Sequence, residues 1–326
     1  MTEVNSNAVS VILPILNEEP YLEHAVNSIL EQEFQGQLEI ILAVGPSKDR
    51  TMELARELSS SDSRIKVIEN PTGRTAAGLN LAIKNSQYPI IVRVDGHANI
   101  PHNYISIAVE LLNKTGAVNV GGVMAAEGQN NFENSVARAM RSPLGVGAAK
   151  FHTGGSAGEV DTVYLGVFKR DALLAVGGFD EHFTRAQDWE LNHRLRKNGG
   201  KIYFDPRLTV TYRPRRSLIA LAKQYFEYGR WRRVVTRIHK ETINYRYLAP
   251  PITLLGVMIS ILASTINTLL IIPAAIYGAF LILASIKIGK GFIEKLLLPI
   301  VLFTMQMSWG LGFLTSPKSL ATKTGS

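Results

Sequence analysis

Apolar positions in the first 120 residues follow two periods, one typical of strands and one typical of helices. Four short β-branched runs have the length of buried strands and cover residues 9–15, 38–44, 65–68 and 90–94. Stretches with apolar residues every three or four positions lie between them, over residues 21–32, 51–58 and 75–85. Units of this spacing predict an α/β domain with a mostly parallel sheet and helices on both faces.

Polar residues follow these predicted strands at the edge where parallel sheets bind their ligands, the carboxyl ends of the strands. Residues 16–18 (Leu-Asn-Glu) come after the first run, and residues 95–97 (Asp-Gly-His) come after the fourth. Further along, Gly-Gly-Phe-Asp-Glu at 177–181 is followed by Gln187, Asp188 and a predicted helix over 191–197. We therefore expect a site built from these three segments.

In this order and spacing, the motifs resemble those of the inverting glycosyltransferases of family 2, over about residues 8–235. Within that family the chain looks most like the succinoglycan-type, membrane-anchored glucosyltransferases, through segments 92–98, 160–163 and 224–231. The resemblance implies a GT-A fold, which is Rossmann-like and mostly parallel. It also implies transfer of a sugar from a nucleotide-diphosphate donor.

Asp95 and His97 are the candidate metal ligands. A divalent cation assists departure of a nucleoside diphosphate because the leaving group gains negative charge. Both Mg²⁺ and Mn²⁺ prefer oxygen ligands, and Mn²⁺ tolerates imidazole better. The family usually has an aspartate where His97 stands, so the sequence leaves open which of the two residues contacts the metal. The alternative is a plain Asp-Gly turn at the end of a strand, with His97 at the surface.

Asp188 is the candidate general base, because the resemblance aligns it with the catalytic aspartate of the family. Inverting transfer needs one carboxylate to take the proton of the attacking hydroxyl. Glu190 would point about 200° around the same helix, so we expect no dyad of the two. An acid in the first turn of a helix is also favoured by the helix dipole, and both roles are compatible. Gln187 replaces the glutamate that usually precedes this aspartate.

The nucleotide sugar is expected to lie against residues at the strand ends: Pro14, Leu16, Asn17, Glu18, Asp49, Arg74, Asp95 and Gly96. For Glu18 and Asp49 the alternative is a role at the start of a helix, and for Arg74 it is an exposed position on a turn. Family members usually carry aspartates at the position of Val44-Gly45-Pro46. That departure leaves the nucleobase open, and we take a UDP-sugar as the expected donor.

Residues for the acceptor or for a lid over the donor come from three segments: Gly154, Gly155, Gln187, Trp189, Gln224, Arg230 and Trp231. Segment 151–158 contains three glycines and is predicted to be a mobile loop, either a lid or an ordinary connection. Related processive polymerases carry Q-x-x-R-W, whereas here Gln224 precedes Arg230-Trp231 by six positions, which argues against a processive synthase. Tyr212 stands where the family often places a metal-binding histidine.

Residues 248–286 and 296–314 contain no Asp, Glu, Lys, Arg or His. A helix of about 20 apolar residues crosses a bilayer, so these runs predict about three transmembrane helices. The first two would turn near 264–267, with Pro250-Pro251 at the entry. The predicted domains are a catalytic domain over 1–212, a basic amphipathic juxtamembrane segment over 213–247, a transmembrane region over 248–316 and a tail over 317–326.

The net charge is +8, and it lies in the juxtamembrane segment, because residues 213–246 hold ten Lys/Arg and two Glu (10 − 2 = +8). A nucleic-acid-binding protein would also be basic. A basic block directly before membrane helices is better explained by anionic lipid headgroups and the positive-inside rule. We therefore expect no nucleic-acid partner. We expect a multi-pass protein of the inner (plasma) membrane with its catalytic domain in the cytosol, and the amphipathic segment either at the headgroup level or against that domain.

The chain contains no cysteine, which excludes disulfides, thiolate catalysis and cysteine metal sites. The resemblance implies a metal-assisted, inverting glycosyltransferase. The acceptor, a hydroxyl of a lipid-linked saccharide in polysaccharide assembly, is implied by the resemblance alone. The alternative hypothesis is a non-catalytic subunit that binds a nucleotide sugar or acts as a scaffold in a membrane complex. That alternative rests on the departures at Val44, Gly45, His97, Gln187 and Tyr212.

Overall fold

The computed structural model describes residues 7–147 and 149–322, and the chain divides into two compact units. Residues 1–6 and 323–326, the latter being the end of the predicted tail, lie outside the described part. The first unit comprises Met1–Ala125 and Gly154–Thr211, and the second comprises Ala126–Thr153 and Tyr212–Ser326. Segment Ala126–Thr153 therefore groups with the C-terminal helices, a division that the hydrophobic pattern alone does not indicate.

An eight-stranded sheet forms the centre of the first unit, with the strand order β3-β2-β1-β4-β7-β5-β8-β6. Its strands are β1 (Ala8–Ile15), β2 (Gln37–Val44), β3 (Ile65–Glu69), β4 (Ile90–Arg93), β5 (Asn119–Ala126), β6 (Gly158–Glu159), β7 (Tyr164–Lys169) and β8 (Ile202–Tyr212). Strands β1 to β4 pair in parallel, whereas β7 pairs antiparallel with β4 and with β5. The predicted mostly parallel α/β architecture is confirmed. The predicted site residues that follow strands lie at the strand ends of its parallel half.

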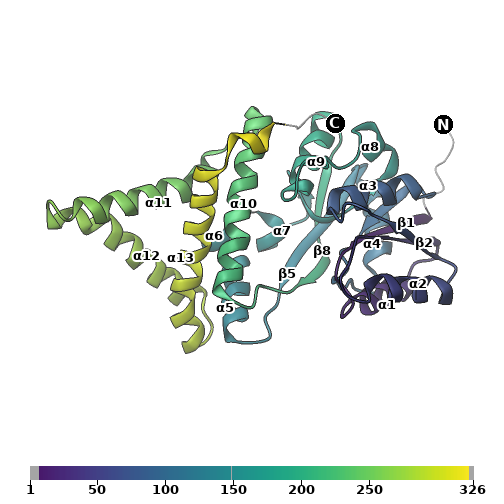
Figure 1. The fold of residues 1–326 in the computed structure, drawn as a ribbon, viewed down its shortest axis with the longest axis horizontal. Coiled ribbons are helices and arrows are strands. Elements are labelled where there is room, and N and C mark those ends of the chain that lie inside the picture. The colour runs from purple at the N-terminus through teal and green to yellow at the C-terminus, as the bar shows by residue number, and fades with distance from the viewer. Residues whose placement is uncertain (1–6, 148, 323–326) are drawn as a thin grey trace. The chain divides into compact units, whose positions relative to one another are not determined.

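Helices cover both faces of this sheet (Figure 1). The helices of the unit are α1 (Leu22–Leu30), α2 (Thr51–Ser61), α3 (Thr75–Asn85), α4 (Tyr104–Thr115), α8 (Arg170–Ala175) and α9 (Gln187–Lys197). Alternate residues of β1 enter different cores, as the period of two requires. Val9, Val11 and Leu13 pack with α1 and α4, whereas Ile12 packs with α3 and α9. Burial on both faces explains the continuous apolar runs in the sequence.

The second unit is helical. Its elements are α5 (Asn131–Met140), α6 (Pro143–Val146), α7 (Lys150–Thr153), α10 (Leu218–Ile238), η1 (Lys240–Thr242), α11 (Tyr245–Ala263), η2 (Thr268–Ile271), α12 (Ile272–Ile288), α13 (Phe292–Thr315) and η3 (Lys318–Ala321). Three stretches are long and apolar enough to cross a membrane: Tyr245–Ala263, Thr268–Ile288 and Phe292–Thr315. The turn between the first two lies at residues 264–267, as predicted.

Two local predictions need correction, and a third helix has a packing partner that the sequence does not indicate. Pro250-Pro251 do not mark the start of the first apolar helix, because α11 begins at Tyr245 and contains both prolines. The predicted loop over 151–158 is helical in its first part, where α7 extends to Thr153. The juxtamembrane segment does form the amphipathic helix α10, but its buried face packs on α13, with Gly229 against the backbone of Trp309. The hydrophobic pattern does not indicate that helix pair.

Candidate functional site

The loops after β1 and β2 are joined by hydrogen bonds at the carboxyl edge of the sheet. The backbone amide of Asn17 donates to the Ser47 hydroxyl (3.0 Å), and the side-chain carbonyl of Asn17 accepts from the Lys48 amide (2.7 Å). Asn17 has a positive φ of 56°, a conformation that Asn tolerates better than most residues. Asp49 caps the same loop, because its carboxylate accepts from the amides of Thr51 and Glu19. The predicted helix-start role of Asp49 is therefore present.

A second part of this edge is tightly packed around two glycines. A Cβ at Gly45 would approach Gly73 Cα to 2.9 Å and the Leu16 side chain to 3.1 Å. Gly73 itself has a φ of 63° and lies against Pro46. Arg74 follows directly, before α3, and no ion pair of its guanidinium is found among the described residues. Pro14 lies inside β1, one residue before its end, against Gly78 of α3.

Glu18 and His97 link the loop after β1 to the loop after β4. His97 Nδ1 lies 2.9 Å from Glu18 Oε1, so the ring donates to the carboxylate when Nδ1 is protonated. A Cβ on Gly96 would lie 3.0 Å from Glu18 Cγ, which explains the glycine between Asp95 and His97. Glu18 is not the first-turn acid that was one alternative for it, because α1 begins at Leu22; its carboxylate instead partners the candidate metal ligand His97.

Arg93 joins the two candidate acids of the site. Its Nε and Nη2 donate to Asp95 Oδ1 at 3.2 and 3.1 Å, and its Nη1 donates to Asp188 Oδ1. The Arg93 side chain is 7% exposed, whereas Asp95 and Asp188 are partly exposed. Alternation along β4 places the Arg93 side chain on the face opposite to that of Val92. The sequence does not predict that this cation brings together two acids that are far apart in the chain.

The surrounding protein changes the acid–base properties of this trio. Desolvation raises the pKa of Asp188 above its ordinary value, Arg93 lowers it, Asp95 raises it, and the net shift is upward. Burial alone would lower the pKa of Arg93, but Asp188 and Asp95 outweigh burial, so the guanidinium stays charged. The upward shift gives Asp188 a higher proton affinity than an exposed aspartate, which suits a general base.

The Gly-Gly-Phe-Asp-Glu motif is held to this site by Asn80 of α3. The Asn80 side chain donates to the Phe179 carbonyl and accepts from the Phe179 amide, both at 2.8 Å, and also donates to Glu181. The Arg93 guanidinium lies 5.8 Å from the centre of the Phe179 ring. The sequence does not single out Asn80, because it stands at an ordinary position within a helical period.

Helix α9 presents Asp188 from its first turn. Ala186, just before the helix, has a positive φ of 61°, and the Gln187 amide group donates to the Phe183 carbonyl (2.9 Å). Glu190 points elsewhere and pairs with Arg194 at 2.7 Å, as expected from the turn of the helix. The Trp189 ring stacks on His193 at 5.7 Å between ring centres, which fixes the rest of the turn.

The other predicted acceptor and lid residues are distributed over both units. Gly154 and Gly155 have positive φ values of 75° and 130°, with open space where a Cβ would lie. Gln224, Arg230 and Trp231 lie on α10 in the second unit, where Gln224 donates to the Tyr212 hydroxyl at 2.7 Å. The Tyr212 hydroxyl therefore has a hydrogen-bond partner within its own unit. A tyrosine also has no imidazole with which to replace the metal-binding histidine that the family often places here.

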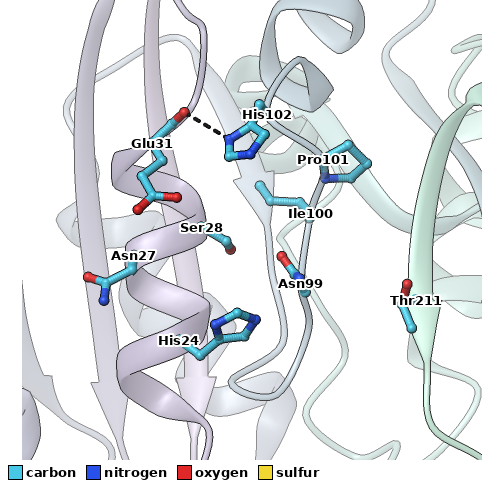
Figure 2. Close-up of a pocket in the computed structure, with 9 residues that line it drawn as sticks. All are labelled: His24, Asn27, Ser28, Glu31, Asn99, Ile100, Pro101, His102 and Thr211. Atoms are coloured by element: carbon cyan, nitrogen blue, oxygen red, sulfur yellow. Dashed lines mark hydrogen bonds between the residues drawn. The ribbon is translucent and has the colours of Figure 1, made fainter.

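A separate cavity of about 450 Å³ lies in the first unit between α1, the segment after the Asp95–His97 loop, and β8 (Figure 2). Its wall is polar, with His24 from α1, Glu31 directly after α1, and Asn99 and His102 from the loop. His102 Nδ1 lies 3.3 Å from the Glu31 carbonyl, as the dashed line in Figure 2 shows. The predicted site residues do not line this cavity.

Residues 10–177 match the family model described as Glycosyl transferase family 2. The succinoglycan biosynthesis protein ExoA of Rhizobium meliloti (strain 1021) is 28% identical over 317 residues, covering 95% of each chain. A dolichyl N-acetyl-alpha-D-glucosaminyl phosphate 3-beta-D-2,3-diacetamido-2,3-dideoxy-beta-D-glucuronosyltransferase of Methanococcus voltae is 26% identical over 322 residues, covering 94% of this chain and 96% of that one.

Solved structures show the same fold. The mannosyltransferase PcManGT from Pyrobaculum calidifontis, in complex with GDP-Man and Mn²⁺, superposes with a TM-score of 0.61 at 19% identity, covering 94% of this chain and 86% of that chain. Residues 1–349 of S. aureus TarS, in complex with UDP-GlcNAc, superpose with a TM-score of 0.51 at 18% identity, covering 70% of this chain and 66% of that chain. At these identities the likeness concerns the fold alone.

Proposed function

Because the chain belongs to glycosyltransferase family 2, we propose that it is an inverting enzyme that transfers a sugar from a nucleotide-diphosphate sugar to a hydroxyl. The observation that carries this proposal is the contact of Arg93 with both Asp95 and Asp188. It brings the acid of the donor-side motif and the candidate base into one site at the carboxyl edge of the sheet. A general base and a donor-side acid at such an edge are what this chemistry requires.

In this proposal Asp188 takes the proton of the acceptor hydroxyl as that oxygen attacks the anomeric carbon. Arg93 contacts Oδ1 of Asp188, and Oδ2 is the second oxygen that can accept the proton. Arg93 fixes the carboxylate in position and stabilises its charge before the reaction. The raised pKa of Asp188 makes proton transfer from a hydroxyl more favourable than it would be to an exposed aspartate.

The residues after β4 fit a divalent cation, which we propose to be Mn²⁺ or Mg²⁺. Both hydrogen bonds from Arg93 end on Oδ1 of Asp95, so Oδ2 can face a metal. His97 would offer Nε2, because Nδ1 faces Glu18. A bound cation would neutralise the charge that develops on the departing diphosphate. A set of one carboxylate and one imidazole suits Mn²⁺ better than Mg²⁺.

For the donor we propose a UDP-sugar, held between the loops after β1, β2 and β4. The two structural neighbours are complexes with GDP-Man and UDP-GlcNAc, so the fold accommodates both purine and pyrimidine nucleotides. Leu16 is 41% exposed beside Gly45 and Gly73 and offers an apolar surface to a base. Asn17, Glu18 and Arg74 border the same edge and would contact the ribose or the diphosphate.

For the acceptor we propose a lipid-linked saccharide in polysaccharide assembly. The name of the Rhizobium relative refers to succinoglycan biosynthesis, and that of the Methanococcus relative to a dolichyl phosphate sugar. The three apolar helices and the basic α10 support an acceptor delivered at a membrane surface. We also propose that the catalytic unit faces the cytosol, since the Lys/Arg excess directly precedes the first apolar helix.

The test is nucleoside diphosphate release from UDP-, GDP- and dTDP-sugars by membranes that contain the protein, with lipid extract as acceptor. We expect release from one donor in Mn²⁺ or Mg²⁺, and loss of that release in EDTA. Tight donor binding without release under any condition would contradict the enzymatic proposal and favour the scaffold alternative. Release that is indifferent to EDTA would contradict the role of a metal.

A further inference from the structure

A groove of about 250 Å³ opens in the second unit where the ends of three helices meet. Arg233 and Arg237 line it from the last turns of α10, and Leu248, Ile252 and Leu255 line it from the first half of α11. Leu314, at the end of α13, lies opposite. The groove is thus cationic on one wall and apolar on the others.

The two arginines are one helical turn apart and face the same groove. Arg237 donates to the carbonyls of Ser316 and Pro317 (2.9 Å each), and the Arg233 guanidinium lies 5.0 Å from the centre of the Phe313 ring. In the described part of the chain, no aspartate or glutamate forms an ion pair with either residue. The two arginines therefore lack a counter-ion, which a bound anion would supply. Burial, and after it the charge of Arg233, lowers the pKa of Arg237.

The apolar wall is formed by the first half of α11, a helix that is long and apolar enough to cross a membrane. Ile252 and Leu255 are 62% and 45% exposed, and they continue the apolar surface of α11 away from the arginines. This places the cationic wall at the level of lipid headgroups and the apolar wall toward the acyl region. An amphiphile with an anionic head matches both walls.

We propose that this groove binds the phosphate of a single-chain isoprenyl phosphate or diphosphate lipid, with Arg233 and Arg237 on the phosphate and the first isoprene units along α11. Guanidinium groups suit phosphate because they offer forked donors. A groove of this size accommodates one hydrocarbon chain, whereas a glycerophospholipid carries two acyl chains. The inference rests on the proposed function in so far as this lipid is the carrier of the acceptor saccharide.

The test is native mass spectrometry of the purified full-length protein with undecaprenyl phosphate. We expect a 1:1 adduct that weakens about tenfold in Arg233→Gln and is unchanged in Arg215→Gln, which removes an exposed cation of the same basic segment. Ile252→Ser, in the apolar wall, should weaken it as well. Dioleoyl phosphatidylglycerol should compete poorly, and inorganic phosphate should not compete at all.

Equal binding by wild type and Arg233→Gln would overturn the proposal, as would equal or tighter binding of phosphatidylglycerol at the same site. Binding is measured without donor, so the two proposals fail separately. A protein that binds the lipid through Arg233 but releases no nucleoside diphosphate refutes the enzymatic proposal alone. A protein that turns over donor with an unaffected Arg233→Gln variant refutes the groove alone.

The third apolar helix, α13, lies beside α10 (Figure 1). The backbones approach closely, because a Cβ on Gly229 would meet Trp309 O at 1.9 Å and one on Gly312 would meet Phe226 O at 2.0 Å. Along its length α10 carries six charged residues: Lys223, Glu227, Arg230, Arg232, Arg233 and Arg237. If α13 crossed the bilayer, this charged helix would be drawn into the hydrocarbon, which is costly.

The two ends of α13 contact polar partners of the same unit. Near its start Glu294 lies 3.5 Å from Arg138 of α5, and beyond its end Ser316 and Pro317 accept from Arg237 of α10. Its exposed apolar residues recur at helical spacing along the free side and include Ile293, Leu296, Ile300, Phe303, Leu311 and Leu314. Because the other face of α13 is packed on the charged helix α10, α13 can stay at the membrane surface without drawing those charges into the hydrocarbon.

We infer that α13 lies in the membrane interface with α10, and that α11 and α12 alone cross the bilayer as a hairpin. The absence of natural cysteine allows a direct test by single-cysteine labelling in sealed vesicles with an impermeant maleimide. Ser319→Cys, beyond α13, should label from the same face as Lys240→Cys, and Ile266→Cys at the hairpin turn should label from the opposite face. Labelling of Ser319→Cys together with Ile266→Cys, opposite to Lys240→Cys, would overturn the inference.

Discussion

Asp188, in the first turn of α9, accepts a hydrogen bond from Arg93, at the end of β4, and the same guanidinium holds Asp95. One buried cation therefore sets the distance between the proposed base and the proposed metal ligand. Positioning of this kind contributes to catalysis because a small misplacement of a reacting group costs much of the rate.

Replacing Arg93 with lysine tests this role while keeping the charge. An ammonium group cannot reproduce the fork that contacts Asp95 and Asp188 together. We expect Arg93→Lys to lower the rate of nucleoside diphosphate release by about tenfold or more. Arg194→Lys is the matched control, because Arg194 pairs with Glu190 on the far side of the same helix, and its rate should stay close to wild type. Equal rates in Arg93→Lys and wild type would remove Arg93 from the positioning of the base.

His97 sets the metal preference in the proposed site. Replacement of an imidazole by a carboxylate supplies the oxygen ligand that Mg²⁺ prefers. We therefore expect His97→Asp to raise the activity in Mg²⁺ relative to Mn²⁺, measured as the ratio of initial rates at saturating metal. His102→Asp, which changes a histidine of the separate cavity, should leave that ratio unchanged. An unaltered ratio in His97→Asp would show that His97 does not contact the metal.

Gly178 tests the attachment of the Gly-Gly-Phe-Asp-Glu motif to Asn80. A Cβ at Gly178 would lie 2.6 Å from Asn80 Oδ1, whereas a Cβ at Gly177 meets no atom within 4 Å. Both glycines have positive φ, so both alanine variants lose about 1–2 kcal/mol from backbone strain. We expect Gly178→Ala to lower the melting temperature further than Gly177→Ala and to reduce activity as well. Equal melting temperatures would contradict the packing described for Asn80.

Glu39 of β2 should make the stability of the first unit depend on pH. Its side chain is 3% exposed; burial raises its pKa, but hydrogen bonds from Gln87, Lys66 and Ser10 together lower it below the ordinary value of 4.5. The ionised carboxylate therefore stabilises the fold above pH 4.5, and this contribution is lost as the pH falls through the lowered pKa. Glu39→Gln should reduce the melting temperature at pH 7 and differ less from wild type near pH 3.

The exposed Glu69→Gln variant of the neighbouring strand β3 is the control for Glu39→Gln. It should change the melting temperature little at either pH, since an exposed ion pair contributes little. A deficit of Glu39→Gln that grows as the pH falls would contradict the direction of the Glu39 pKa shift.

The parallel half of the sheet could be predicted from the sequence because buried strands are continuous apolar runs and the helices between them keep a clear period. Asp95 could be singled out because it follows a predicted strand, and Asp188 because the resemblance aligns it with the catalytic aspartate of the family. The role of Asn80 could not, since an asparagine within α3 gives no local signal and its partner Phe179 is 99 positions away. Its importance depends on tertiary packing alone.

The second unit was predicted only in part. Apolar length identified the three C-terminal helices, but length cannot tell a lipid-exposed helix from one that packs on a protein surface. The apolar segment of α13 is 44% buried, compared with 11% for α11, because α10 and α5 cover it. The close approach at Gly229 and Gly312 depends on which helices pack together, and the hydrophobic period of a single helix does not predict its partner.

The most direct test of the central claim is the rate of sugar transfer by Asp188→Asn, measured together with donor affinity. The account predicts a fall in kcat on the order of 10²-fold or more, with donor Kd unchanged, because the amide cannot take the proton of the acceptor. Glu190→Gln, in the same turn but directed at Arg194, should keep both values close to wild type. An Asp188→Asn protein that transfers sugar at the wild-type rate would contradict the assignment of Asp188 as the base.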